Sequence, residues 1–353
     1  MTTEQVLHKI YREESGKIIS VLTKIFGATN LNLSEDVMQE AYIEALEKWG
    51  NRIPKNPTAW IYSVARNKAL NIVNQNKYKE EHQNEVAHLS TSDWTADTLL
   101  DMLFSEEEMK DDQLKMMFIC CTPEIFPEAQ TTLILKTLCG FGIPEIAKAF
   151  LIAPDTINKR LVRAREILKN VNALFTWPEE DEINQKVSNV LQTIYLLFNE
   201  GYSASQGDSI IRYELCLESI RLVQLILDSD QVKSKSEANA LMALMKLNAA
   251  RFIARLSKDG EAISMENQDR SKWDQSLIGS GIQNLNKSMY ENQVSKYLIM
   301  AAISANHCAA KTYAETQWDQ ILILYDQLVK IEDSPIVQLN RSVAKSMVKK
   351  IRK

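Results

Sequence analysis

Apolar residues recur at helical spacing over most of the chain. The pattern runs from about residue 3 to residue 78, with one break at GNRIPKNP, residues 50–57, where two prolines and a glycine indicate a loop. It resumes from about residue 111 to 172, and again from about 183 to 345. Amphipathic helices of this kind, one after another, predict an all-α fold.

Interruptions of the pattern predict four segments. Between the first two helical blocks the sequence is polar and acidic with weak periodicity, which is typical of a flexible linker, and TWPEEDE at residues 176–182 precedes the third block. The predicted segments are a first helical domain at 1–78, a linker at 79–110, a second helical domain at 111–175 and a helical extension at 180–353. Helices joined by short polar turns favour a TPR-like repeat array for the extension, with an irregular helical bundle as the alternative.

The stretch PEIAKAFLIAPDTINKRLVRARE, residues 144–166, predicts a short helix, a turn and a second helix that begins at Pro154. The second helix has one apolar seam, formed by Ile157, Leu161, Ala164 and Leu168. Its polar and basic positions are Thr156, Lys159 and Arg163, with Asn158, Arg160 and Arg165 on the flanks. This spacing fits a helix-turn-helix that reads duplex DNA, and it also fits an ordinary solvated helix.

Acidic positions recur on one side of the helix SEDVMQEAYIEALEKW, residues 34–49. Asp36, Glu40 and Glu47 share this side with Ile43, and Gln39 lies beside them. An isoleucine within an outward acidic face is typical of a surface that binds a basic protein partner. A solvated charged face with one stray apolar residue is the alternative.

The helix TAWIYSVARNKALNIVNQNK, residues 58–77, carries aromatic, amide and cationic groups and no acid. Its apolar side consists of Ile61, Ala65, Ala69 and Ile72. Its opposite side presents Trp60, Ser63, Asn67, Asn71 and Asn74, with Arg66 and Lys68 at the edges. Rings that stack on bases, amides that bind base edges and cations that hold phosphates equip a single-strand binding surface. A tryptophan packed into a helical core is the alternative.

Composition narrows these alternatives only a little. Lys and Arg number 41 against 46 Asp and Glu, for a net charge of −5, so the chain as a whole repels phosphate and any DNA contact must be local. We expect a cytoplasmic protein without a membrane span, since neither a signal-peptide core nor a long apolar run is visible. The five cysteines lack CxxC spacing and are expected to be buried as small apolar residues.

The order of these features resembles one family. An acidic helix, a proline loop, a Trp/Asn/Arg helix, an acidic linker and a helix-turn-helix are together similar to the sigma-70 family of transcription initiation factors, in particular its extracytoplasmic-function group. The third block looks like the TPR-like extension of one subgroup, through the segments YLLFNEGYSAS, RYELCLESIRL, ENQDRSKWDQSLI and SPIVQLNRSVA. The resemblance covers nearly the whole chain.

The resemblance implies a function for each face. Contact with core RNA polymerase, at the β′ clamp helices and the β flap, is expected, with clamp-helix binding assigned to Asp36, Gln39, Glu40 and Ile43. Reading of the −10 promoter element as single strand is assigned to Asn56, Trp60, Ser63, Arg66, Asn67, Lys68 and Asn71. Reading of the −35 element as duplex is assigned to Thr156, Asn158, Lys159, Arg160, Arg163 and Arg165. The extension is a candidate surface for a regulatory protein.

Other classes of function are not favoured. No nucleophile-base pair, metal set or glycine-rich phosphate loop is visible, so we expect neither an enzyme nor a bound cofactor or metal. A DNA-binding regulator that never engages polymerase, or a helical-repeat scaffold, are the alternatives to a sigma factor.

Two departures from the family pattern stand out. Leu151 and Ala153 occupy turn positions where glycine and serine are common, and an apolar residue in the turn costs little if it packs inward. The sequence given ends in KSMVKKIRK, earlier than the extension of the subgroup, which leads us to expect a shortened C-terminus.

Overall fold

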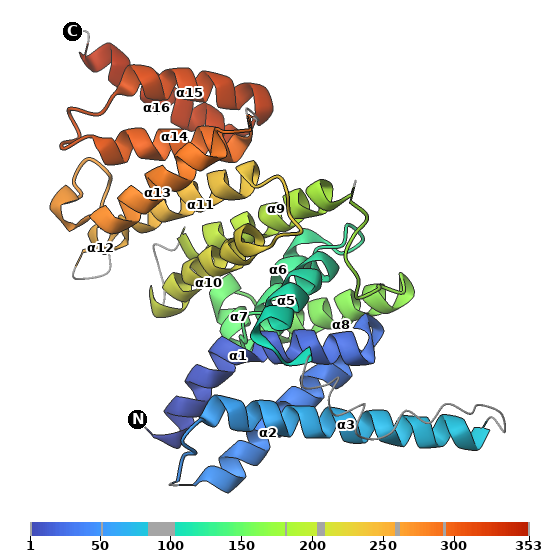
Figure 1. The fold of residues 1–353 in the computed structure, drawn as a ribbon. Helices are drawn as coiled ribbons and strands as arrows, with labels where there is room; N and C mark the ends of the chain where they lie inside the picture. Colours follow the sequence, from blue (N-terminus) through green and yellow to red (C-terminus); the bar gives the residue numbers. More distant parts are fainter. Residues whose placement is uncertain are drawn as a thin grey trace. The chain divides into compact units, whose positions relative to one another are not determined.

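The computed structural model describes residues 2–50, 52–83, 103–180, 182–202, 209–257, 262–291 and 294–351 (Figure 1). These residues form helices joined by turns and loops, with one isolated β-bridge between Leu256 and Ala262, so the all-α prediction is confirmed. The chain divides into two compact units, Met1–Thr193 and Ile194–Lys353, and α9 (Ile183–Tyr202) runs across the boundary.

Three long helices open the first unit: α1 (Thr3–Phe26), α2 (Leu31–Trp49) and α3 (Pro57–Gln83), with a short 3-10 turn, η1 (Ala28–Asn30), between the first two. A capping box starts α1, because the Thr2 hydroxyl accepts a hydrogen bond from the Gln5 amide while the Gln5 side chain accepts one from the Thr2 amide. The predicted apolar side of α3 is buried at Ile61, Ala65 and Ala69, whereas Ile72 is half-buried.

The first unit continues with α5 (Glu106–Cys120), α6 (Pro127–Thr137), α7 (Ile143–Phe150) and α8 (Pro154–Asn170). Helix α8 begins at Pro154, as predicted. All four residues of its predicted seam are buried: Ile157, Leu161, Ala164 and Leu168. The predicted linker at 79–110 is helical at both ends, because α3 continues to Gln83 and α5 begins at Glu106, and its middle lies outside the described residues. The four predicted segment boundaries stay predictions.

Helix α1 lies against the segment between α6 and α7. A Cβ atom placed on Gly16 would lie 2.2 Å from the Leu138 carbonyl oxygen, so the two backbones touch here without a side chain between them. The Arg12 guanidinium lies 3.6 Å from the centre of the Phe141 ring and pairs with Glu145 at 2.8 Å. Gly140 turns the backbone through a positive φ of 64° between these contacts.

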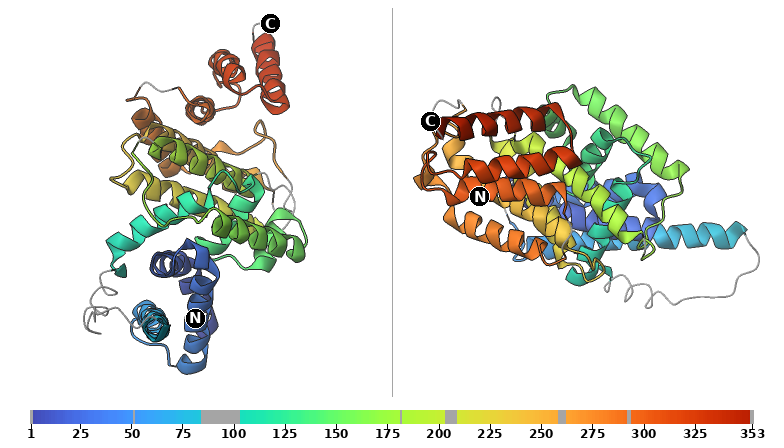
Figure 2. Two further views of the ribbon diagram at one scale, coloured as in Figure 1. Left: turned by 90° about the vertical axis from the view of Figure 1, so that its right-hand side faces the viewer. Right: turned by 90° about the horizontal axis from the view of Figure 1, so that it is seen from above.

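The second unit consists of helices that pack on their neighbours in the chain. Its helices after α9 are α10 (Ser209–Asp228), α11 (Ser236–Ala249), α12 (Phe252–Arg255), η2 (Arg270–Lys272), α13 (Gln275–Ser288), α14 (Lys296–Ala309), α15 (Trp318–Ile331) and α16 (Pro335–Ile351). Helix α11 contacts α10, α13 and α14, and α15 contacts both α14 and α16 (Figures 1 and 2). Because α11 is buried on nearly all sides, it forms the centre of this part of the unit.

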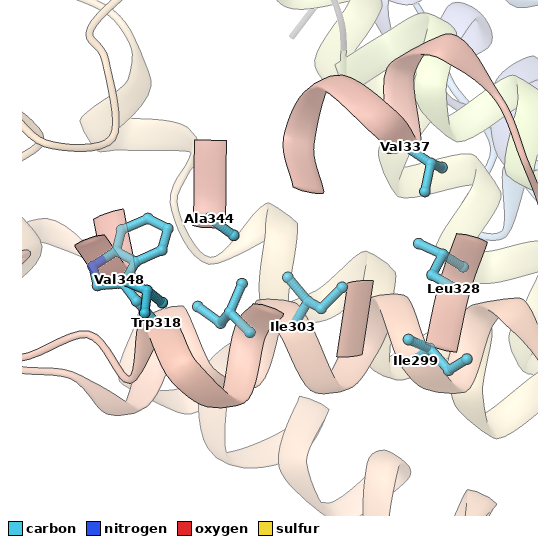
Figure 3. Packing of buried hydrophobic residues seen from close by; sticks show 8 residues of the cluster. Ile299, Ile303, Trp318, Leu328, Val337, Ala344 and Val348 are labelled. Carbon is cyan, nitrogen blue, oxygen red and sulfur yellow. The ribbon is translucent and has the colours of Figure 1, made fainter. Parts of the chain in front are cut away.

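An apolar cluster holds the last three helices, α14, α15 and α16, together (Figure 3). Ile299 and Ile303 come from α14, Trp318 and Leu328 from α15, and Val348 from α16. The His307 ring meets the Trp318 ring edge-on at 5.3 Å between centroids.

Four of the five cysteines are buried, as predicted, and Cys308 is half-buried. All five are free. Burial raises the pKa of the Cys121 and Cys216 thiols to about 12, which keeps both groups neutral and unreactive near neutral pH.

Candidate polymerase and nucleic-acid interfaces

The acidic face of α2 is open to solvent. Asp36, Gln39 and Glu40 are exposed, and the Ile43 side chain is 53% exposed. Leu46 is 49% exposed and adds a second apolar residue to this face. Sequence reasoning missed Leu46, although it follows Ile43 by three residues and therefore lies beside it on a helix. The face thus offers carboxylates around a small apolar patch.

The predicted single-strand face of α3 is also exposed along most of its length. Ser63, Asn67 and Asn71 are exposed, while Trp60 is half-buried and meets the Trp49 ring edge-on at 5.4 Å between centroids. Trp60 therefore belongs partly to the packing of α3 on α2 and partly to the surface.

Two of the predicted DNA-contacting groups already have local partners. The Asn56 side-chain oxygen accepts a hydrogen bond from the Ala59 amide at 3.1 Å, so it caps the start of α3. The Ser63 hydroxyl donates to the Ala59 carbonyl at 2.9 Å. When a nucleic acid approaches, each of these side chains must either keep its hydrogen bond or exchange it for one to the nucleic acid.

Lys68 links the two predicted surfaces. Its amino group pairs with Glu40 at 3.0 Å and with Glu44 at 3.5 Å, which joins α3 to α2. The hydrogen bond to Glu40 raises the pKa of Lys68 above its usual value. Arg66 is half-buried on the same helix. A residue assigned to DNA and one assigned to polymerase therefore contact each other.

Helix α8 presents most of its predicted DNA-reading residues to solvent. Thr156, Asn158, Lys159 and Arg163 are exposed, and Arg160 is half-buried. Pro154 and Asp155 stand in the first turn, where the missing amide hydrogen of proline costs nothing and a carboxylate is favoured by the helix dipole. Cations and small polar groups thus occupy one outward side of α8.

Arg165 is placed differently from the other basic residues of α8. Its guanidinium pairs with Glu35 of α2 at 2.5 Å, and the Glu35 side chain is buried. The Glu35 Oε1 atom and the Arg165 Nε atom are buried without a further hydrogen-bond partner among the described residues. Arg165 therefore joins α8 to α2 in this arrangement, and its predicted contact with DNA stays a prediction.

The turn between α7 and α8, residues 151–153, places Leu151 toward solvent. Leu151 does not pack inward: it is 72% exposed and has a positive φ of 53°. The turn needs a left-handed residue at this position to end α7, and the chain supplies a leucine where glycine would fit without strain.

We expect Leu151→Gly to raise the free energy of unfolding of the first unit by up to about 1 kcal/mol, because glycine adopts this backbone conformation without the clash of a Cβ atom. Chemical denaturation followed by circular dichroism measures the change. Leu151→Ala is the control, since alanine keeps the Cβ atom and should give no gain. Equal gains from both replacements would assign the effect to removal of an exposed apolar side chain instead.

The described residues offer neither a membrane span nor a cluster of metal ligands. Among the helices that the structure describes, none is long and apolar enough to cross a membrane. Within the same described ranges, no group of three or more His, Cys, Asp and Glu side chains converges as a metal site would require.

Comparison with known proteins assigns the N-terminal part. Residues 10–78, which include α2 and most of α3, match the family Sigma-70 region 2. Residues 186–289 match a family described as a family of unknown function, DUF6596. The chain thus carries a segment similar to sigma-70 region 2, which supports a sigma-70 family factor.

Two relatives extend this result. The chain belongs to the same family as the protein named Uncharacterized protein R00370 of Rhizobium meliloti (strain 1021), with 33% identity over 318 residues that cover 90% of this chain and 74% of the relative. It is also similar to the ECF RNA polymerase sigma-E factor of Haemophilus influenzae, with 23% identity over 155 residues, 44% of this chain and 80% of that protein. No solved structure matches the chain at a significant level.

Proposed function

We propose that this chain binds core RNA polymerase and directs promoter-specific initiation of transcription. The observation that carries the proposal is that the sigma-70 region 2 match, residues 10–78, contains two faces. One is an exposed acidic-apolar face on α2, and the other is a face on α3 where Asn67 and Asn71 are exposed beside the half-buried Trp60. One face suits a protein partner and the other suits unpaired bases.

The α2 face is the proposed polymerase-docking surface. Asp36 and Glu40 supply negative charge around Ile43 and Leu46, which together supply apolar area. A basic partner surface with an apolar centre would complement this arrangement, because charges steer the encounter and buried apolar groups hold the complex. The clamp helices of the β′ subunit are the proposed partner, with a second contact at the β flap.

The α3 face is the proposed reader of the −10 element as single strand. Trp60 offers a ring for stacking, and Asn67 and Asn71 offer amides that can donate to and accept from base edges. Arg66 and Lys68 lie at the edges of this face, where a phosphate backbone would pass.

Helix α8, with α7 before it, is the proposed helix-turn-helix that reads the −35 element as duplex. Thr156, Asn158 and Lys159 lie in the first two turns, the part of such a helix that contacts base edges in the major groove. Arg163 lies one turn further along, where it can reach a phosphate or a guanine.

The remaining parts of the proposal concern the whole chain. The net charge of −5 is compatible with DNA binding because the cations of α3 and α8 are local and the polymerase supplies further contacts. We propose that the protein lies in the cytoplasm and has no enzymatic activity of its own. We also propose that the second unit is a TPR-like extension that binds a regulatory protein.

In vitro transcription with purified core polymerase tests the proposal. Addition of the chain should give new start sites on genomic fragments, preceded at a constant distance by a shared −10 and −35 sequence. A protein that binds promoter DNA but gives no new start site would be a DNA-binding regulator. A protein that binds neither DNA nor core polymerase would be a helical-repeat scaffold.

Trp60→Ala should make the free energy of open-complex formation less favourable by about 1 to 3 kcal/mol, because one base loses its stacking partner. Permanganate footprinting of unpaired thymines in the −10 element measures the opening, and gel shift with a −35 duplex measures the other contact. Trp60→Phe is the matched control, since it keeps a ring against Trp49 and should retain most opening. Equal loss of opening and of duplex binding would contradict the proposed division between α3 and α8.

A further inference from the structure

The second unit contains a pocket with a volume of about 380 Å³. Helices α11, α14, α15 and α16 contribute to its lining, together with Tyr202 from the end of α9. Tyr202, Tyr313 and Trp318 supply aromatic surface, and Ile303 of the cluster in Figure 3 supplies an aliphatic part of the wall. The volume is that of a site for a small molecule.

A buried arginine faces this pocket. Arg251 is 7% exposed, and no carboxylate of the described residues forms an ion pair with it. Its guanidinium donates a hydrogen bond to the Tyr202 hydroxyl and lies 5.7 Å from the centre of the Trp273 ring, while its Nε atom has no hydrogen-bond partner among the described residues. Burial of a cation without a counter-charge is costly, so such a group points to an anion that completes the site.

The surroundings of Arg251 add positive potential. Arg270 donates hydrogen bonds to the carbonyl oxygens of His307 at 2.6 Å and Ala310 at 2.7 Å, which fixes a second guanidinium close by. Burial, followed by the charges of Arg251 and Arg270, lowers the pKa of His307 to about 4. The His307 ring is therefore neutral near pH 7 and can share a hydrogen bond without adding charge.

Two more residues of the pocket lining carry a buried polar atom that lacks a partner among the described residues. The Nδ1 atom of His307 and the Nε1 atom of Trp318 are both buried, and neither has a hydrogen-bond partner within the described part of the chain. Indole nitrogen only donates, whereas a histidine nitrogen can donate or accept. Buried groups of this kind are usually satisfied in a complete site.

We propose that this pocket binds a small organic anion with a planar apolar body, whose carboxylate or phosphate group lies against Arg251. The aromatic side chains would cover the apolar body of the ligand. Such a ligand provides the counter-charge that no described residue supplies to Arg251. The proposal stands on the pocket alone, and it does not depend on polymerase or DNA binding by the first unit.

Calorimetric titration of the full chain with benzoate, phenyl phosphate and neutral benzamide tests the proposal. At least one of the two anions should bind with a Kd below about 1 mM and raise the melting temperature, and it should bind at least about tenfold more tightly than benzamide. Comparison of the two anions distinguishes a carboxylate site from a phosphate site. Equal binding of the anions and benzamide, or no anion binding up to about 10 mM, would overturn the proposal.

Variants locate the binding. Arg251→Gln should weaken anion binding by at least about tenfold, whereas Lys272→Gln, which removes an exposed cation beside Arg270, should leave it within about twofold. Ser304→Phe should abolish anion binding, because the phenylalanine ring fills the pocket while every cation remains. This variant tests the proposal if Arg251→Gln does not fold. Unchanged affinity in folded Ser304→Phe protein would place the anion elsewhere and contradict the proposal. So would a chain that binds acidic peptides but neither aryl anion.

Discussion

Replacement of Arg165 by alanine is expected to lower the free energy of unfolding of the first unit by about 3 kcal/mol, because it leaves the buried Glu35 carboxylate without a counter-charge. The two groups lie 2.5 Å apart and join α8 to α2. Arg165 therefore stabilises the packing of the unit, unlike the solvated cations on the outward side of α8.

Arg163→Ala is the matched control, since Arg163 is an exposed arginine on the same helix. Its removal should change the free energy of unfolding by less than about 0.5 kcal/mol, yet weaken binding to a −35 duplex by about 1 to 3 kcal/mol if it reads a base. Urea denaturation and fluorescence anisotropy with a labelled duplex measure the two effects on the same samples. A stability loss from Arg163→Ala equal to that from Arg165→Ala would contradict this division.

A double replacement separates loss of the pair from loss of packing. Glu35→Leu combined with Arg165→Met removes both charges and keeps apolar volume, so it should recover most of the stability that Arg165→Ala loses. The buried Glu35 Oε1 and Arg165 Nε atoms, which have no other partner among the described residues, favour this outcome. If the double variant is as unstable as Arg165→Ala, the loss comes from side-chain packing and the charge argument fails.

Periodicity was enough to predict the fold and the local faces. In α8 the spacing of Ile157, Leu161, Ala164 and Leu168 correctly predicted the buried side, because a helix that packs on one face must repeat apolar residues at that interval. The start at Pro154 followed from the fixed φ of proline in the same way. Such local signals depend only on neighbours in the sequence.

The contacts between distant helices were not predictable in the same way. Glu35 did carry a signal: it follows Leu31 by four residues and precedes Met38 by three, so it lies on the buried side of α2. A carboxylate in that position needs a partner, but spacing alone could not show that the partner is Arg165. This ion pair changes the interpretation of Arg165, which the sequence assigned to DNA.

The pocket of the second unit was missed for the same reason. Arg251, His307 and Trp318 come from three separate segments, and each is unremarkable where it stands in the sequence. Only the packing of α14 on α11 and of α15 on α14 brings them together. The sequence left the orientation of Leu151 open, and the left-handed turn that ends α7 places its side chain outward.

A close backbone approach in the first unit depends on Gly16. A Cβ atom on this residue would lie 2.2 Å from the oxygen, 2.8 Å from the carbonyl carbon and 2.9 Å from the Cα atom of Leu138. All three are backbone atoms, which cannot move aside as the end of a side chain can. Relief would require α1 to shift away from the segment that carries Gly140 and Phe141, and the contacts of Arg12 with Phe141 and Glu145 would be lost with it.

Gly16→Ala should therefore lower the free energy of unfolding of the first unit by more than about 3 kcal/mol, although alanine is the better helix former. Gly279→Ala on α13 is the control, because a Cβ atom there meets nothing within 4 Å and the higher helix propensity of alanine should stabilise the second unit by up to about 1 kcal/mol. Hydrogen exchange assigns each change to its unit. If both replacements raise the free energy of unfolding, α1 and Leu138 do not touch in solution. The packing of Arg12 on Phe141 would then be contradicted as well.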